Sequence, residues 1–515
     1  MSTATLLRGA AVADGIGGTT RRADVQTDGL AIAAVDVIDP VPSGCEVIDL
    51  APGSVICPGF TDAHAHAEGP LLAFGRVEGA LAQGVTTLVV GQDGSSWVGA
   101  SAETARYLNQ YFAPVNGALE PTRELGVAEY RQALSGRLSQ NVAVLASQGT
   151  IRHNVAGMAP GPMDPDQRKA ARAELEKALT DGAVGLSSGL DYLPSRFGDV
   201  SEIAELARPL AAADRPYVSH LRSYGPEVRV GLDELVAVGR VAGIRVHASH
   251  LWGPPAEIDL SFNAADAAGV AISYDMYSYR RSSTILAMLL LPSEVQAGGP
   301  ARTLAALTDR RQRTALLADE KFSDEFLRRI VLGCLPADMA GYAGQMITQA
   351  AARTSRPAGE WVLDLLVDAG LKVGAHLDRP SLTEDTLAWL ALGDRHCAGS
   401  DGIYQGQHPH PRGYSAFARL AQHYLADGPA TGYQRLVRHL SASAADVYRL
   451  RNRGRLAPGM AADICVIGPD GITGHATYDS PEQIATGVSL VMVNGVITWR
   501  DGQPVTDYFP GEMIS

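Results

Sequence analysis

Short apolar runs alternate with longer polar segments along the chain between about residues 60 and 425. The runs are strand-like and predict β-strands, while the polar segments between them predict helices. Repeated βα units are typical of a parallel sheet covered by helices. Eight alternations predict an α/β protein with a (β/α)8 TIM barrel. The strand candidates are residues 59–66, 86–91, 142–149, 183–189, 216–222, 246–251, 271–277 and 396–401.

Two regions depart from this alternation. After residue 277 the next inward strand comes more than a hundred residues later, and a structureless loop of that length is implausible. We therefore expect residues 286–357 to form a small inserted subdomain near the barrel mouth. Residues 1–58 and 454–515 are β-like and turn-rich. They predict one flanking β-sandwich, built from both chain ends, beside a barrel at residues 59–453.

The overall composition excludes some classes of binding partner. The 515 residues carry a formal charge of -13 and no concentrated basic patch, which argues against binding to nucleic acid. The five cysteines are scattered without a CxxC pair, as in reduced cytosolic proteins. No stretch is long and apolar enough to span a bilayer. We expect a cytoplasmic protein that acts on a small molecule, without a membrane partner, and we leave open whether it forms a homo-oligomer.

His64 and His66 lie two residues apart at the end of the first predicted strand. A period of two sends both side chains to the same face, here the barrel interior. The spacing alone gives weak support for a metal site, because about 0.3 such pairs are expected by chance among 13 histidines. A second pair, His408 and His410, is indeed present.

The ends of other predicted strands carry further candidates for metal binding. His220 ends the fifth run, His250 the sixth and Asp401 the eighth. Because catalytic groups in barrel enzymes project from the carboxyl ends of different strands, we expect these side chains to converge. Four imidazoles and a carboxylate form a ligand set suited to zinc. His247, three residues before His250, is expected to face the surrounding helices instead.

Several motifs of the chain resemble those of one family. The family is that of the N-acyl-D-amino-acid deacylases (D-aminoacylases), within the amidohydrolase superfamily. The resemblance covers nearly the whole chain and is weakest in the inserted segment. The motifs are PGFTDAHAH (58–66), GVTTLVVGQDG (84–94), GAVGLSSGLDY (182–192), GSDG (399–402), HPHPRGYSAF (408–417) and GRLAPGMAADICVI (454–467).

The resemblance implies one tightly bound zinc ion, with a second, weaker site left open. It also implies the hydrolysis of an N-acyl-D-amino acid to a carboxylate and a D-amino acid. Asp401 would be the catalytic acid and base. The metal ligands carried over by motif are His64, His66, His220, His250 and Asp401.

The sequence departs from the family pattern after the second strand. Where the family often has a cysteine ligand, this chain has Asp93. A carboxylate also ligates zinc, so we predict Asp93 as a ligand, the alternative being a turn in which Asp93 bonds only its own backbone. The fourth strand contains no lysine, which argues against a hydantoinase-like dinuclear centre.

A second departure concerns substrate binding. Trp252 follows the strand-six histidine, where the family usually has a lysine that pairs with the substrate carboxylate. This leaves room for a larger, aromatic or neutral amide. Arg412 offers a bidentate fork for a carboxylate. The residues predicted to bind substrate are Tyr192, Trp252, Tyr277, Ser283 and Arg412, with Arg222, Arg280 or Arg281 as alternative cations.

The sequence therefore predicts a metal-dependent hydrolase that acts on C–N bonds other than peptide bonds. Two alternatives stay open at this stage. One is a dipeptide or cyclic-amide hydrolase, similar to dihydroorotase or hydantoinase. The other is a catalytically inactive scaffold of the same fold. A serine hydrolase is not favoured, because neither Ser187-Ser188-Gly189 nor Gly399-Ser400-Asp401-Gly402 is expected to form a nucleophile elbow.

Overall fold

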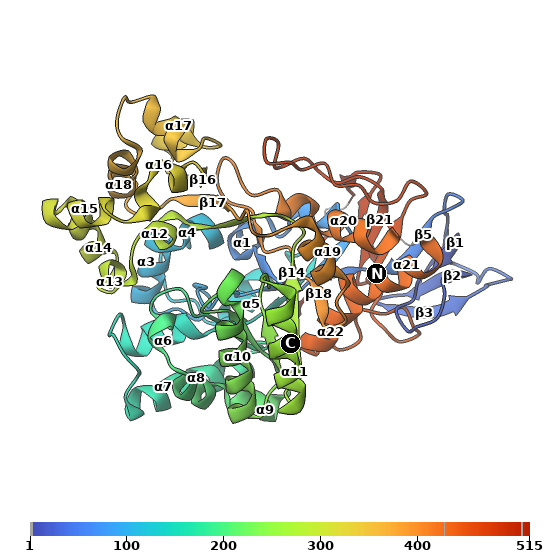
Figure 1. Cartoon of the computed structure of the whole chain (residues 1–515). Coiled ribbons are helices and arrows are strands. Elements are labelled where there is room, and N and C mark those ends of the chain that lie inside the picture. The colour runs from blue at the N-terminus through green and yellow to red at the C-terminus, as the bar shows by residue number, and fades with distance from the viewer. Residues whose placement is uncertain (1–3, 427, 506–507) are drawn as a thin grey trace.

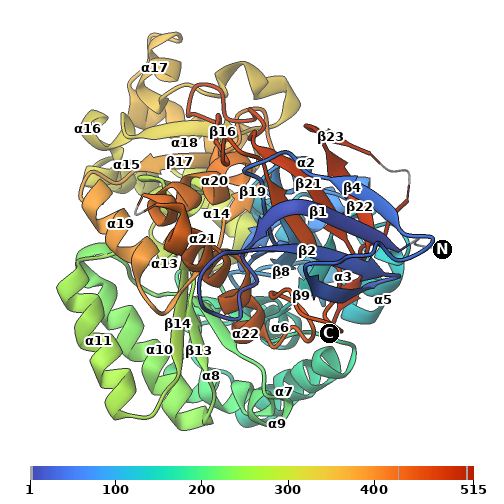
Figure 2. The same cartoon turned by 90° about the vertical axis from the view of Figure 1, so that its right-hand side faces the viewer.

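The computed structural model describes residues 4–426, 428–505 and 508–515. It has three parts. Central strands are surrounded by helices, strands from both chain ends lie to the right in Figure 1, and a largely yellow helical part lies at the upper left. Figure 2 looks onto the right-hand side and shows the blue N-terminal and red C-terminal strands together. The protein is therefore a mixed α/β protein.

The central strands pair in parallel, and each of the eight predicted runs overlaps at least one of them. One sheet has the order β10-β11-β12-β13-β14-β18, and a second contains β6, β8 and β9. The strands are β6 (Phe60–Asp62), β7 (Ala65–His66), β8 (Val85–Val90), β9 (Asn141–Val144), β10 (Ala146–Ser147), β11 (Leu186–Gly189), β12 (Tyr217–His220), β13 (Val246–Ala248), β14 (Ile272–Met276), β18 (His396–Ala398) and β19 (Gly402–Ile403).

Backbone hydrogen bonds connect these two sheets on both sides. The amide of Ala63, after β6, donates to the carbonyl oxygen of Ala398 in β18 at 2.9 Å. On the other side β9 is followed at once by β10, and the amide of Val184 donates to the carbonyl of Val144 at 2.9 Å. A separate core cluster joins small or branched residues of several strands to helix α22 (Ser443–Tyr448). The carboxyl ends of all these strands consequently lie at one edge.

The helices between the strands form where the sequence supplies caps and an apolar stripe. In α7 (Pro165–Thr180), Asp164 and Gln167 form a capping box, and Ala171 and Leu175 are buried one turn apart. The other main helices are α1 (Glu68–Phe74), α3 (Ala102–Tyr111), α4 (Ala113–Asn116), α5 (Val127–Leu134), α6 (Gln148–Ala156), α8 (Val200–Ala207), α10 (Val228–Ala242), α11 (Pro255–Ala267), α19 (Glu384–Leu392), α20 (Arg412–Leu425) and α21 (Pro429–Val437).

The two chain ends share one nine-stranded sheet, as their β-like sequence predicts. The strand β5 (Val55–Pro58) pairs antiparallel with β20 (Ile464–Ile467), which joins the N-terminal strands to the C-terminal ones. The last strand, β24 (Met513–Ile514), leaves this sheet and pairs in parallel with β9. The remaining strands are β1 (Thr5–Val12), β2 (Arg21–Asp28), β3 (Ala31–Asp36), β4 (Glu46–Asp49), β21 (Val488–Val493), β22 (Val496–Arg500) and β23 (Gln503–Pro504).

The region after residue 277, which interrupts the βα alternation and is called the irregular interval below, forms a small α/β unit. Its antiparallel sheet has the order β15-β17-β16. The sheet uses residues on both sides of the expected segment 286–357, because β15 precedes it and β17 follows it. Its elements are β15 (Arg281–Ile285), α12 (Leu286–Leu290), α13 (Ser293–Gln296), α14 (Gly299–Thr308), α15 (Arg310–Leu317), α16 (Asp324–Leu327), β16 (Ile330–Cys334), α17 (Ile347–Ala352), α18 (Ala358–Asp368) and β17 (Gly374–Asp378). Within the described ranges, no helix is long and apolar enough to cross a membrane.

Candidate metal centre and substrate cavity

Six polar side chains meet at the carboxyl ends of the central strands. They come from the ends of β6, β7, β12, β13 and β18 and from the turn after β8. None is more than 9% exposed. The sequence predicted this convergence, and the six are His64, His66, Asp93, His220, His250 and Asp401.

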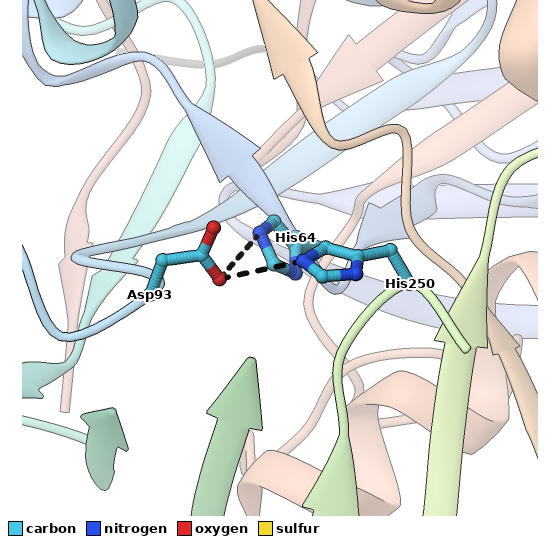
Figure 3. Close-up of side chains that lie close together, drawn as sticks. All are labelled: His64, Asp93 and His250. Carbon is cyan, nitrogen blue, oxygen red and sulfur yellow. Dashed lines mark ion pairs between the residues drawn. The ribbon is translucent and has the colours of Figure 1, made fainter. Parts of the chain in front are cut away.

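The Asp93 carboxylate lies at the centre of the cluster. Its Oδ1 is 3.5 Å from Nε2 of His64 and 3.6 Å from Nε2 of His250. Its Oδ2 is 3.5 Å from Nε2 of His66 and 3.6 Å from Nδ1 of His220. Figure 3 shows the Asp93 carboxylate aimed at the His64 and His250 rings. The side chain therefore does not turn back to bond only its own backbone.

Asp401 lies on the other side of the two strand-one histidines. Its Oδ1 is 3.4 Å from Nε2 of His66 and 3.7 Å from Nε2 of His64. Its Oδ2 is 2.8 Å from Nη1 of Arg412, whose side chain is fully buried. The amide of Asp401 also donates to the carbonyl of His64 at 2.8 Å. These contacts hold the carboxylate in one place beside the imidazoles.

The unused polar atoms of this cluster fit a cation. Nε2 of His64 and Oδ1 of Asp93 are buried without a hydrogen-bond partner, which is costly unless another ligand satisfies them. Two sets of side chains have ligand atoms within 4.8 Å of one another: His64, Asp93 and His250, and His64, His66 and Asp401. Imidazole nitrogens and carboxylate oxygens are ligands that zinc accepts. The residues present therefore fit a metal centre.

Three of the six residues have strained backbone conformations. Asp93, His250 and Asp401 have φ values of 55°, 36° and 49°. Non-glycine residues rarely adopt this left-handed region, and such outliers cluster at functional sites. Each follows a parallel strand directly or within a few residues, so the chain turns sharply where the side chain must face inward.

Electrostatics keep the carboxylates of the cluster ionised. Burial opposes ionisation of Asp401, but the Arg412 guanidinium and the neighbouring imidazoles together outweigh it and hold the pKa of that carboxyl below its usual range. Burial likewise favours neutral His66, but the hydrogen bonds and negative charges of Asp401 and Asp93 together outweigh it and raise the pKa of His66 to about 10. Burial lowers the pKa of His250. Without a metal, the site thus holds ionised carboxylates next to a basic His66 and a neutral His250.

Asp275 and His247 support the metal cluster, and sequence reasoning missed both. Oδ2 of Asp275 is 3.3 Å from Nδ1 of His64 and 3.0 Å from Nε2 of His247. Oδ1 of Asp275 accepts a hydrogen bond from the His250 amide at 2.9 Å. The expectation that His247 only faces the surrounding helices was therefore wrong. A lone acid in the apolar strand AISYDMY was the available signal, because buried charges need partners.

A cavity of about 300 Å3 opens above the metal cluster. Its walls come from the strand ends, from the loops after β12 and β13, and from the α/β unit of the irregular interval. Tyr192, Tyr277 and Ser283 line it, as the resemblance implied, and so does Trp252, where the sequence departs from the family pattern. The hydroxyl of Tyr192 is 2.9 Å from that of Thr284, also a lining residue.

The arginines of this cavity differ from those predicted. Arg412 is fully buried behind Asp401, and its guanidinium carbon lies 4.6 Å from the Tyr277 ring centre. The Arg412 guanidinium therefore contacts Asp401 and Tyr277. This corrects the expectation that it binds the substrate carboxylate. Arg329 and Arg379 line the cavity instead. Of the alternative cations, Arg222 pairs with Glu234, Arg280 faces Asp378 and Arg281 stacks on Tyr478.

Comparison with known proteins agrees with this geometry. The chain matches the amidohydrolase family over residues 336–506. It is 29% identical to N-acyl-D-glutamate deacylase of Alcaligenes xylosoxydans xylosoxydans, covering 99% of this chain and 96% of that protein. A solved structure of a D-aminoacylase with a binuclear metal centre has a TM-score of 0.82 to this chain at 26% identity, with 99% of both chains covered.

A third relative was solved with a ligand. N-acyl-D-glutamate deacylase of Bordetella bronchiseptica, in complex with zinc and a phosphonate mimic of the tetrahedral intermediate, has a TM-score of 0.83 at 26% identity over 100% of both chains. The fold and the site thus define an amidohydrolase. Within that class, the chain is similar along nearly its whole length to the N-acyl-D-amino-acid deacylases.

Proposed function

We propose that this protein hydrolyses the amide bond of an N-acyl-D-amino acid, or of a related D-configured amide, in a metal-dependent reaction. The observation that carries the proposal is the buried cluster of four imidazoles and two carboxylates at the floor of a substrate-sized cavity. A relative that matches nearly the whole chain is named for this kind of reaction, as an N-acyl-D-glutamate deacylase. The products are a carboxylate and a free D-amino acid.

His64, Asp93 and His250 would hold one zinc ion tightly, with His220 beside them. His64, His66 and Asp401 would form a second, weaker position. When bound, the metal supplies Lewis acidity that polarises the amide carbonyl and makes water more acidic. The choice of zinc rests on the mixture of imidazole and carboxylate ligands.

Asp401 is the general base and acid of this proposal. Its carboxylate, kept ionised by Arg412, accepts a proton from the water that attacks the amide carbon. When the C–N bond breaks, Asp401 returns that proton to the leaving nitrogen. Burial raises the pKa of the Tyr192 phenol well above its ordinary value, so its hydroxyl stays protonated. That hydroxyl lines the cavity and is a donor for the developing oxyanion.

Arg379 is the cation best placed to hold a substrate carboxylate. Its guanidinium carbon lies 4.9 Å from the Trp252 ring centre and 5.6 Å from that of Tyr277. Its Nε donates to the carbonyl of Arg280, and its Nη2 donates to those of Tyr279 and Arg281. Those bonds fix the plane of a guanidinium that lines the cavity, so a bound carboxylate meets a preorganised partner.

We also propose the finer architecture. The parallel strands β6, β8, β9–β10, β11, β12, β13, β14 and β18 would form a closed (β/α)8 barrel at residues 59–453, supported by the Ala63–Ala398 hydrogen bond. The chain ends, 1–58 and 454–515, would form a β-sandwich, supported by their shared sheet. The inserted subdomain near the mouth would contain 286–357, with β15 and β17 at its borders.

Other properties follow from the same proposal. The partner would be a small amide, because the cavity of about 300 Å3 lies over the metal ligands. A cytoplasmic location is supported by the five cysteines, all of which are free thiols. Homo-oligomer formation stays open.

The test combines metal loading with a panel of amides. Zinc-loaded protein is assayed with N-acetyl-D-amino acids, their L-isomers, dipeptides and cyclic ureides. We expect turnover of the D-isomers only. Asp401→Asn should keep tightly bound zinc and lose nearly all turnover, because it removes the base while leaving an oxygen ligand.

Each other outcome favours a different function. Turnover of dipeptides or cyclic ureides alone would identify the alternative hydrolase. Protein without tightly bound metal and without activity would be an inactive scaffold. An active Asp401→Asn variant would contradict the role given to this carboxylate.

A further inference from the structure

A second cavity, of about 270 Å3, adjoins the substrate cavity across the Trp252 indole. Trp252 and Ser381 line both cavities. The same three segments of chain form both walls. Ser223 and Tyr224 line the first cavity, and the next two residues line the second. The two cavities are therefore consecutive parts of one groove, with the indole between them.

The indole is held in this position by two contacts. The Arg379 guanidinium lies over its ring at 4.9 Å. In addition, Gly225 has φ of +63°, and a Cβ there would lie 2.7 Å from the Cη2 atom of Trp252. The amide of Gly225 also donates to the Trp252 carbonyl at 3.2 Å. Glycine thus allows the indole to pack directly against the backbone of the 223–226 loop.

The chemistry of the second cavity differs from that of the first. The first contains the acids and imidazoles of the metal cluster together with Arg329 and Arg379. The second has no charged side chain among its described lining residues. These are Gly225, Pro226, Trp252, Gly253, Pro254, Pro255, Ser381, Leu382 and Thr386. Such a surface favours an apolar, uncharged group.

We propose that the second cavity receives a bulky apolar side chain of the D-amino-acid half of the substrate. This inference rests on the proposed function. Because Arg379 holds the carboxylate and touches the indole, the amino-acid end of the substrate lies next to Trp252. The side chain leaves the same carbon atom as the carboxylate, so it extends past the indole into the apolar part of the groove. The preferred substrates are N-acyl derivatives of aromatic or large aliphatic D-amino acids.

The experiment measures kcat/KM of the zinc-loaded protein for N-acetyl-D-alanine, -leucine, -phenylalanine and -tryptophan. We expect the value to rise by at least about tenfold from alanine to the largest favoured side chain. Thr386→Tyr, on α19, fills the second cavity and should lower this ratio by about tenfold. Asp385→Tyr is the matched control, because Asp385 is exposed on the same helix outside both cavities. It should leave the ratio unchanged.

A wild-type ratio near one would overturn the inference, and so would a ratio that Thr386→Tyr leaves unchanged. Both results keep the proposed function, because amides are still hydrolysed. If none of the four D-amides is hydrolysed, the inference fails, and the proposed function stands only if another N-acetyl-D-amino acid of the wider panel is hydrolysed.

Discussion

At the scale of single residues, Asp275 has the widest influence on the metal cluster without being one of its ligands. One oxygen faces Nδ1 of His64, and the other accepts from the backbone amide of His250. Burial opposes its charge, but His64 and His247 outweigh it and hold the pKa of Asp275 far below its usual range. Partners of this kind orient metal-binding imidazoles and raise their basicity.

Replacing Asp275 should therefore weaken metal binding without removing a ligand. Asp275→Asn is expected to lower zinc affinity by about 10- to 100-fold, measured by competition with a chelator. Asp266→Asn is the control, since Asp266 is an exposed carboxylate that pairs with Arg395. Unchanged zinc affinity in Asp275→Asn would show that the contact with His64 has no role in metal binding.

At the scale of elements, the turn after β8 sets the position of Asp93. Gly94 has φ of +64°, and a Cβ there would lie 2.8 Å from the Ser188 Cα and from the Gly189 amide nitrogen in β11. Its own amide donates to the Ser187 hydroxyl at 3.1 Å. The turn thus packs directly on the neighbouring strand, which requires glycine both for its conformation and for its small size.

Gly94→Ala should consequently be much more harmful than the same change at an open site. Gly269 has a similar φ of +67° with nothing within 4 Å of its missing Cβ, so Gly269→Ala reports conformational strain alone. We expect Gly269→Ala to cost roughly 1 kcal/mol. Gly94→Ala should cost more and also reduce bound zinc. Chemical denaturation and metal analysis measure both, and equal effects of the two variants would contradict the steric argument.

The elements also show what a sequence can and cannot predict. The strand ends that carry His64, His220 and His250 were predicted because alternation and parallel packing place such residues together. Arg379 was not, since it enters the cavity through the antiparallel pairing of β15 with β17, which links stretches about a hundred residues apart. The burial of Arg412 behind Asp401 was missed for the same reason: it depends on tertiary contacts that no local pattern encodes.

At the scale of the whole molecule, buried neutral histidines predict sensitivity to acid. His439 is stacked on Tyr424 and lies 3.0 Å from the His396 carbonyl through Nδ1. Burial lowers the pKa of His439 to about 4. In the unfolded chain a histidine titrates near its ordinary pKa of about 6.5. Between these values the unfolded state binds more protons, so stability falls as the pH decreases through this window.

This effect can be measured as melting temperature against pH. The wild type should lose stability from pH 6.5 to pH 4, with His439 contributing up to about 1.4 kcal/mol per pH unit. His439→Gln should show a shallower dependence, whereas His475→Gln, at an exposed position, should not. Identical slopes for wild type and His439→Gln would contradict the assignment.

The central claim is that distant strands gather their imidazoles and the Asp93 carboxylate around one ion. Its most direct test is anomalous diffraction at the zinc edge from crystals of the zinc-loaded protein. The account predicts a strong peak about 2.0–2.2 Å from His64 Nε2, His250 and an Asp93 oxygen. An absent peak, or one bound elsewhere with these side chains turned away from each other, would contradict it.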